Sequence, residues 1–178
     1  SEVEEALYLL DRDLQAVQEE EQVKITKPKI GIMVEVPSVL LQIDEFAPLV
    51  DFFSVGSNDL TQYLLAVDRN NPRVANVYSH FHPAVLRALT CLVKECHKYD
   101  KPVSICGEMA GDPLATPLLV GLGLTELSMN ARSVPLVKYL IRQLTIAQTQ
   151  EWAEQILTLR TTAEIKQRLE EIATKFDI

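Results

Sequence analysis

Four short apolar runs alternate with longer amphipathic stretches along this chain, and this alternation limits the possible fold more than any other feature. The runs cover residues 29–36, 50–56, 102–107 and 126–130. Each is too short for a buried helix, and each is followed by residues with helical spacing. Strands that alternate with helices form parallel sheets, because each helix carries the chain back to the same end of the sheet. We therefore predict an α/β fold with four parallel strands.

Amphipathic patterns around these runs predict the helices. They cover residues 2–22, 37–47, 60–67, 83–99, 113–122, 134–142 and 147–157, and a last helix follows Thr161. Capping boxes at Ser1–Glu4 and Thr161–Glu164 mark the starts of the first and last helices. Because the first helix opens the chain abruptly, we expect residues 1–178 to form one domain cut from a longer, multidomain protein.

The composition is that of an ordinary soluble globular domain, with 47% hydrophobic and 24% charged residues. A net charge of −8 without a basic cluster argues against nucleic acid or an anionic membrane as a partner. No apolar run is long enough to span a bilayer. Three cysteines in no disulfide or C-x-x-C pattern favour the cytoplasm. Cys91 and Cys96 point about 140° apart on a predicted helix, so we do not expect them to form a zinc site with the histidines.

The stretch from Val50 to Arg69 contains the most informative residues. Its strand ends at Gly56 and runs into Ser57–Asp59, three residues of types that cap helices well. A strand that passes through glycine into a helix presents backbone N–H groups and a carboxylate at its carboxyl end, where α/β proteins bind phosphates and metals. Arg69 lies ten positions past Asp59 and can fold back toward the same anion.

Functional side chains follow three of the four predicted strands. Glu35 ends the first strand, Asn58 and Asp59 follow the second, and Cys106 ends the third. Two carboxylates from adjacent strand ends, without a neighbouring histidine or cysteine, form a hard oxygen site that suits Mg²⁺. On this pattern alone, helix capping stays open as the role of Asp59, and buried packing stays open as the role of Cys106.

The run from Gly56 to Tyr63, GSNDLTQY, and its continuation Ala66–Arg69, AVDR, resemble the binding signature of phosphoenolpyruvate (PEP)-utilising enzymes. Within that family the chain looks most like Enzyme I of the bacterial phosphotransferase system, and the resemblance covers nearly its whole length. It implies that residues 1–178 are the C-terminal half of a PEP-binding (β/α)₈ TIM barrel, because four βα units are half of a fold that takes ~250 residues. A self-contained open α/β sheet is the alternative.

The resemblance also implies a role for each candidate residue. Glu35, in the run GIMVEVP, matches a magnesium ligand, and Asp59 matches the second ligand. Asn58 and Asp59 match residues that contact PEP, and Arg69 matches an arginine that holds the phosphoryl group. Cys106, in the run SICGEMAG, matches the cysteine that delivers a proton to the enolate carbon. Mg²⁺ is therefore the expected cofactor.

The activity that the resemblance implies is that of a phosphoenolpyruvate-protein phosphotransferase. The phosphoryl group of PEP moves to a histidine on an absent upstream domain and then to a histidine phosphocarrier protein, and pyruvate is released. A cytoplasmic homodimer is expected. Two arginines that the family contributes from earlier barrel strands are missing, so we expect the chain to lack turnover by itself. Residues 69–76 and 128–134 look closer to the nitrogen-related branch of Enzyme I than to the sugar-related branch.

Two functions of other classes stay open. One is a Mg²⁺-dependent lyase of the related pyruvate-enolate barrels, which would need neither Cys106 nor Arg69. The other is a non-catalytic module for dimerisation or ligand sensing, since Enzyme I dimerises through this domain. Titration with PEP, with and without Mg²⁺, separates the module from the two enzymes.

Overall fold

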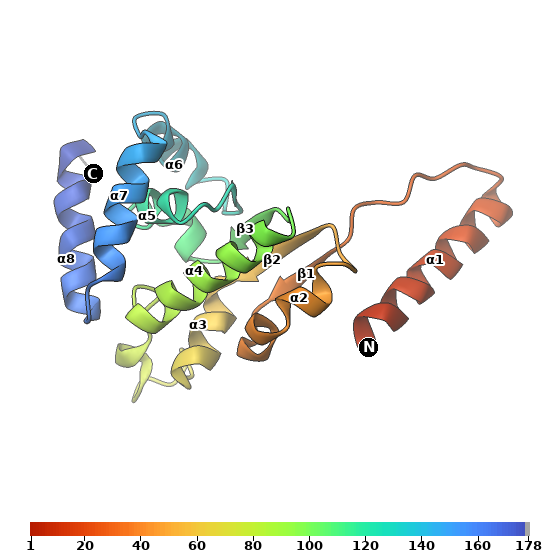
Figure 1. Cartoon of the computed structure of the whole chain (residues 1–178), viewed down its shortest axis with the longest axis horizontal. Helices are drawn as coiled ribbons and strands as arrows, with labels where there is room; N and C mark the ends of the chain where they lie inside the picture. Colours follow the sequence, from red (N-terminus) through yellow and green to blue (C-terminus); the bar gives the residue numbers. More distant parts are fainter. Residues whose placement is uncertain (177–178) are drawn as a thin grey trace.

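The computed structural model describes residues 1–176 and contains the four predicted strands and the helices between them (Figure 1). The strands are β1 (Gly31–Val34), β2 (Phe52–Gly56), β3 (Val103–Cys106) and β4 (Glu126–Leu127). The α-helices are α1 (Glu2–Glu21), α2 (Ile43–Phe46), α3 (Ser57–Leu65), α4 (Pro83–Lys98), α5 (Thr116–Gly121), α6 (Val134–Ile141), α7 (Ile146–Leu157) and α8 (Thr162–Ala173). Short 3₁₀ helices are η1 (Pro37–Leu41), η2 (Ala75–Val77), η3 (Met109–Gly111) and η4 (Thr174–Phe176).

The four strands form one parallel sheet in the order β1-β2-β3-β4, which confirms the predicted α/β fold. The register places Val34 beside Val55 and Gly56 beside Cys106. Strand order therefore follows chain order, as it does around a (β/α)₈ barrel, whereas doubly wound open sheets reverse their order at a switch point. This order is consistent with part of a PEP-binding barrel.

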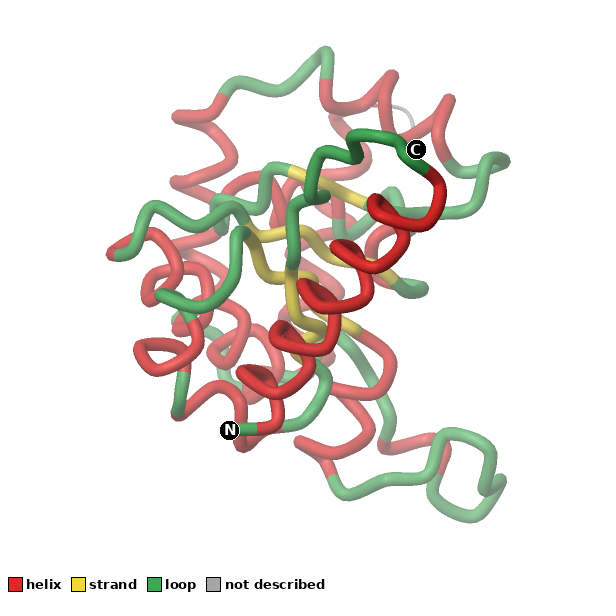
Figure 2. The backbone as a smooth tube through the Cα atoms, turned by 90° about the vertical axis from the view of Figure 1, so that its right-hand side faces the viewer, coloured by secondary structure: helices red, strands yellow, loops and turns green. Residues whose placement is uncertain are grey.

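The two faces of the sheet differ in what covers them. Val55 and Ile105 are completely buried in a core cluster that also contains the apolar side of α4. The alternate residues Met33, Ser54 and Cys106 point to the other face, and Met33 is 47% exposed. The yellow strands lie near the centre of Figure 2, and in that view α1 passes in front of them. One face of the sheet is thus packed and the other is open, and the latter corresponds to the inside of a barrel.

Helix α1 stands apart from the other helices (Figure 1). None of its residues is fully buried, and the Tyr8 side chain is 66% exposed. Its links to the rest of the chain include an ion pair of 2.5 Å between Lys27 and Asp11 and a contact of Val3 with the core cluster. The apolar stripe that predicts this helix is therefore only partly covered by the described residues.

Two of the differences between the predicted boundaries and the structure concern how an element is built. Residues 37–47 form η1 and α2 instead of one helix, because Gln42 takes φ −132° and interrupts the helical backbone. Strand β4, at the edge of the sheet, contains only Glu126 and Leu127 instead of residues 126–130. The capping boxes at Ser1 and Thr161 are confirmed, and Thr145 forms a further one at the start of α7.

Helices α5 and α7 pack closely together at Gly121, the last residue of α5. A Cβ atom at this position would overlap the carbonyl oxygen of Thr149 in α7 and would lie 3.0 Å from Cβ of Ala153. The obstacle is backbone, which cannot turn away as the end of a side chain can. The absence of a side chain at Gly121 therefore sets the spacing of these two helices.

We expect Gly121→Ala to lower the free energy of unfolding by about 1–3 kcal/mol, the usual cost of overpacking. Urea unfolding followed by circular dichroism measures this change. Gly111→Ala is the matched control, because a Cβ atom there would meet side-chain atoms of Ser133 and Met129 at 3.1 Å and beyond. An equal loss in both variants, or no loss at Gly121, would contradict the close packing of α5 on α7.

Candidate functional site

Strand β2 runs directly into α3, and this junction forms the centre of the candidate site. The helix begins at Ser57 and its N-cap is Gly56, with no capping hydrogen bond from a side chain. The prediction that Ser57–Asp59 cap the helix is therefore wrong, because these residues already lie within its first turn. Their side chains are available for other contacts, and the Ser57 hydroxyl donates a hydrogen bond of 2.6 Å to the carbonyl oxygen of Cys106.

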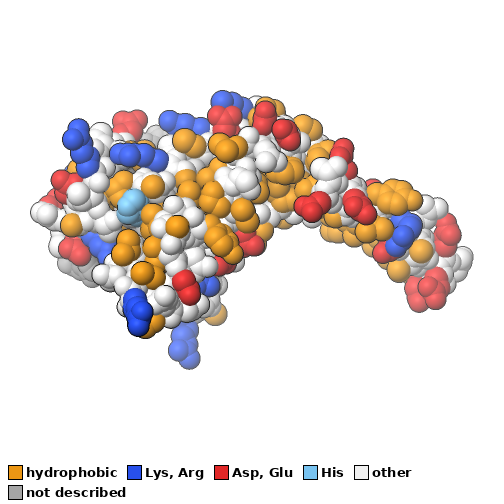
Figure 3. All heavy atoms as spheres, turned by 90° about the horizontal axis from the view of Figure 1, so that it is seen from below, with side chains coloured by type: hydrophobic (Ala, Val, Ile, Leu, Met, Phe, Trp, Pro, Cys, Tyr) orange, Lys and Arg blue, Asp and Glu red, His pale blue; other side chains and the backbone are white. Residues whose placement is uncertain are grey.

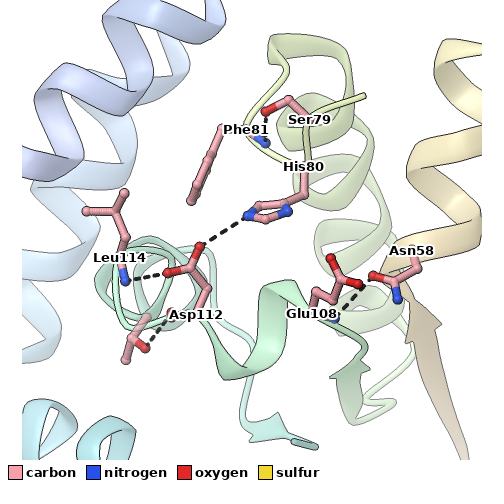
Figure 4. Close-up of polar contacts among 8 residues, drawn as sticks. Asn58, Ser79, His80, Phe81, Glu108, Asp112 and Leu114 are labelled. Carbon is pink, nitrogen blue, oxygen red and sulfur yellow. Dashed lines mark hydrogen bonds and ion pairs between the residues drawn. The ribbon is translucent and has the colours of Figure 1, made fainter. Parts of the chain in front are cut away.

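Asn58 links α3 to the segment after β3 (Figure 4). Its Oδ1 accepts a hydrogen bond of 3.1 Å from the backbone N–H of Glu108. Because a backbone N–H only donates, this contact fixes which end of the amide is oxygen and leaves the NH₂ group as a donor for another partner. Asn58 also lines an open cavity of about 360 Å³ together with Cys106, Gly107, Glu108, Ser128, Met129 and Asn130.

Gly107 allows the segment after β3 to lie against α3. Its φ is 94°, and a Cβ atom there would overlap Oγ of Ser57 and lie 3.0 Å from Oδ1 of Asn58. Glycine is required for both reasons. Gly111, further along the same segment, lies against Ser133.

Cys106 is the last residue of β3 and borders the cavity, with its Sγ 3.3 Å from the carbonyl oxygen of Val55. Cys96 in α4 differs, because it is completely buried and burial raises its pKa to about 12. Its thiol is therefore inert at neutral pH. Cys91 is exposed on the same helix.

No group of three or more His, Cys, Asp or Glu residues suited to a metal ion occurs within residues 1–176.

Glu35 follows β1 and crosses the end of β2. Its Oε2 and Cβ lie 2.8 and 2.9 Å from the point that a Cβ atom of Gly56 would occupy, so glycine makes room for the carboxylate. In the register of the sheet, Gly56 lies beside Cys106 on the neighbouring strand β3. Within residues 1–176 the Glu35 carboxylate has no hydrogen-bond or ion-pair partner, and Asp59 lies in the first turn of α3. These two carboxylates offer oxygen ligands of the kind that Mg²⁺ prefers.

Arg69 folds back toward α3, as its spacing predicts. The turn is made at Ala66, whose φ of 52° ends the helix in the left-handed conformation. The backbone N–H of Arg69 donates to Oε1 of Gln62 at 3.2 Å, and its Nη2 lies 3.8 Å from Oδ1 of Asp59. Its Nη1 is buried and has no hydrogen-bond partner among the described residues. A buried cationic donor without a partner is costly, so the geometry favours an anionic ligand here.

Two contacts beside the site could not be read from the sequence. The Tyr78 hydroxyl donates a hydrogen bond of 3.2 Å to the carbonyl oxygen of Asn58. Nε2 of His80 lies 3.2 Å from Oδ2 of Asp112, which joins the loop before α4 to the segment after η3 (Figure 4). Neither pair has a motif or a fixed spacing that would have identified it.

A larger hollow, about 490 Å³, lies elsewhere, between the segment before α5 and helices α6 and α8. Pro113, Leu114, Leu136 and Ala173 make most of its lining apolar, and its Asp112 is already paired with His80. It is therefore a poorer candidate for chemistry than the cavity at Asn58 and Cys106.

None of the described helices has the length and apolar character needed to cross a membrane.

Comparison with known proteins agrees with the geometry. The chain is 47% identical over 168 residues, 94% of its length, to a protein of Escherichia coli K12 named "Phosphoenolpyruvate-dependent phosphotransferase system", and this match covers 22% of that protein. It is 49% identical over 149 residues to Multiphosphoryl transfer protein 1 of the same strain, which covers 84% of the chain and 18% of the relative. It is 46% identical over 137 residues to the phosphoenolpyruvate-protein phosphotransferase of Bacillus subtilis, which covers 77% of the chain and 24% of the relative.

The chain thus spans about a fifth to a quarter of the length of these relatives. Residues 1–146 match the family described as "PEP-utilising enzyme, PEP-binding domain". This match includes all four strands and every candidate residue at their carboxyl ends. The chain therefore belongs to the PEP-utilising enzymes and carries part of their PEP-binding domain.

Proposed function

We propose that this chain is the C-terminal half of the PEP-binding barrel of a phosphoenolpyruvate-protein phosphotransferase. The complete enzyme transfers the phosphoryl group of PEP to a histidine on another domain and releases pyruvate. The buried, unpartnered Nη1 of Arg69 supports this function most directly. It lies on a side chain next to Asp59, in a loop that returns to the carboxyl ends of the strands.

The substrate carries a phosphate and a carboxylate, and two groups of the site suit these anions. The Arg69 guanidinium remains charged at any working pH and offers several N–H donors in one plane. The NH₂ group of Asn58 is a neutral donor, held in place because its oxygen is bonded to Glu108. As the phosphorus–oxygen bond of PEP breaks and a phosphorus–nitrogen bond to the histidine forms, Arg69 stabilises charge on the phosphoryl oxygens.

Glu35 and Asp59 are the residues that would hold Mg²⁺. Both carboxylates come from the ends of neighbouring strands and offer oxygen ligands, which fits this ion. When bound, Mg²⁺ supplies positive charge that neutralises the negative charge on the substrate oxygens. The contribution of the chain is to place the Glu35 carboxylate over the end of β2, where Gly56 makes room for it, and Asp59 in the first turn of α3.

Cys106 is the proposed proton donor to the enolate left by phosphoryl transfer. Its thiol borders the cavity beside Asn58 and donates to the Val55 carbonyl oxygen at 3.3 Å. A rotation about the Cα–Cβ bond releases the thiol from this contact. The proton then moves to the enolate carbon to form pyruvate, and solvent returns a proton to the thiolate.

Three finer assignments belong to the same proposal. Residues 69–76 and 128–134 favour the nitrogen-related branch of Enzyme I. A histidine phosphocarrier protein is the expected final acceptor, reached through domains outside this chain. A cytoplasmic homodimer is the expected form, and the three cysteines are free in the structure.

In the complete enzyme, Glu35→Ala or Asp59→Ala should lower Mg²⁺-dependent phosphorylation by PEP at least about 100-fold, because neutralising substrate charge contributes several kcal/mol. Incorporation of ³²P from labelled PEP at several Mg²⁺ concentrations measures the effect. Glu45→Ala, which removes an exposed carboxylate of α2, should behave like the wild type. Near-normal phosphorylation by either site variant, with unfolding unchanged, would refute the two-carboxylate site.

Cys106→Ala should separate the two halves of the reaction. Phosphohistidine should still form, because charge neutralisation and alignment do not depend on the thiol. Protonation of the enolate should slow by about 10²–10⁴-fold and lose its facial selectivity, since only solvent remains as the acid. Serine should rescue little, because a hydroxyl is a far weaker acid than a thiol.

A single-turnover assay with labelled PEP in heavy water follows phosphohistidine and the stereochemistry of pyruvate together. Cys91→Ala is the control, since this thiol is exposed on α4. Stereoselective pyruvate formation at the normal rate by Cys106→Ala would assign Cys106 to packing alone.

The 178-residue chain, prepared alone, should self-associate. Strands β1 and β4 are the edges of the described sheet, and apolar side chains cover much of the middle of the face seen in Figure 3. Such edges and patches are covered in a closed barrel. Sedimentation velocity should show dimers or larger species, and adding the preceding half of the barrel should convert them to a one-to-one complex. A monodisperse monomer that does not bind the preceding half of the barrel would instead support a self-contained sheet.

A further inference from the structure

We propose that Tyr78 is a positioning residue of the phosphoryl site, which holds the loop that carries Arg69 against the first turn of α3. This inference rests on the proposed function and extends it to a residue outside the PEP-binding motif. Tyr78 follows η2 at the far end of that loop.

The Tyr78 hydroxyl forms the contact that closes the loop. It donates a hydrogen bond of 3.2 Å to the carbonyl oxygen of Asn58, across 20 positions of sequence. Asn58 is the second residue of α3, so Tyr78 touches the same turn that carries Asp59. The phenol is partly buried there, which favours a fixed geometry over a solvated one.

Two hydrogen bonds to α3 hold the loop that carries Arg69, one near each end of the loop. Near its start, the backbone N–H of Arg69 donates to Oε1 of Gln62, and near its end, Tyr78 bonds to Asn58. Burial raises the pKa of Tyr78, while the positive charge of Arg69 opposes this rise. Arg69 therefore lies close to the phenol, which keeps its proton at neutral pH and remains a donor.

The consequence concerns preorganisation. A free arginine side chain loses rotamer entropy when a ligand fixes it. Anchors that already restrict the loop reduce that cost before the ligand arrives. The benefit applies only to ligands that engage Arg69, which means ligands with a phosphoryl group. Pyruvate shares the carboxylate of PEP but has no phosphoryl group, so its binding should not depend on Tyr78.

Tyr78→Phe in the complete enzyme tests this, because the ring stays and only the hydroxyl is lost. Calorimetric titration in the presence of Mg²⁺ should show PEP binding weakened about three- to tenfold, the range for one hydrogen bond. Pyruvate binding should stay within about twofold, since it lacks the group that Arg69 holds. Tyr99→Phe is the control, because Tyr99 lies at the end of α4 and is 40% exposed. A general loosening of the fold would weaken both ligands, whereas the proposed role weakens PEP alone.

A second arm repeats the measurement in the Arg69→Lys background. If Tyr78 acts through Arg69, Tyr78→Phe should weaken PEP binding by less than about a further twofold in this background. The guanidinium group that Tyr78 positions is already absent there. A full additional loss, equal loss for both ligands, or no loss in the single variant would each overturn the inference. Failure of the wild-type enzyme to bind PEP or to become phosphorylated would instead overturn the proposed function, so the two failures are distinguishable.

Discussion

The hydrogen bond from the Ser57 hydroxyl to the carbonyl oxygen of Cys106 joins the ends of two strands, and the arrangement of the site depends on it. At 2.6 Å it is short, and Ser57 is only 2% exposed, so water does not compete for it. It needs the close approach that Gly107 permits with its φ of 94°. Once the segment after β3 lies against α3, the N–H of Glu108 reaches Asn58 and orients its amide. One buried contact therefore fixes both the proposed proton donor and a proposed substrate ligand.

The open face of the sheet explains why polar groups can gather there. Residues that point to the packed face, such as Phe53 and Ile105, are completely buried. On the other face Ser54, Ser104 and Cys106 alternate with them and remain partly exposed. A charged side chain can therefore lie at the end of a strand without the cost of full burial. Glu35 uses this freedom, and the missing side chain of Gly56 supplies the space.

Much of the fold could be predicted because hydrophobic spacing is a local signal. The parallel order followed from strands that alternate with helices, and the predicted return of Arg69 toward Asp59 is realised through the turn at Ala66. Two errors share a physical cause. Cap propensity suggested that Ser57–Asp59 precede the helix, and periodicity suggested one helix over residues 37–47, but neither signal contains the backbone angles at the junction. Tyr78 was missed because its partner lies 20 positions away, and only the path of the loop brings the two together.

The weakness of the pair between Arg69 and Asp59 suits a site that must exchange partners. Their atoms lie 3.8 Å apart, well beyond the ~2.7–2.9 Å of a strong charge-assisted hydrogen bond. The side chains are 34% and 42% exposed, so solvent screens the attraction, and such pairs contribute about 0–1 kcal/mol. A tight bidentate pair would have to break before either group could bind a ligand. A loose pair limits repulsion within the empty site and yields readily, because an anion on the guanidinium and a cation on the carboxylate each offer a stronger interaction than the one they replace.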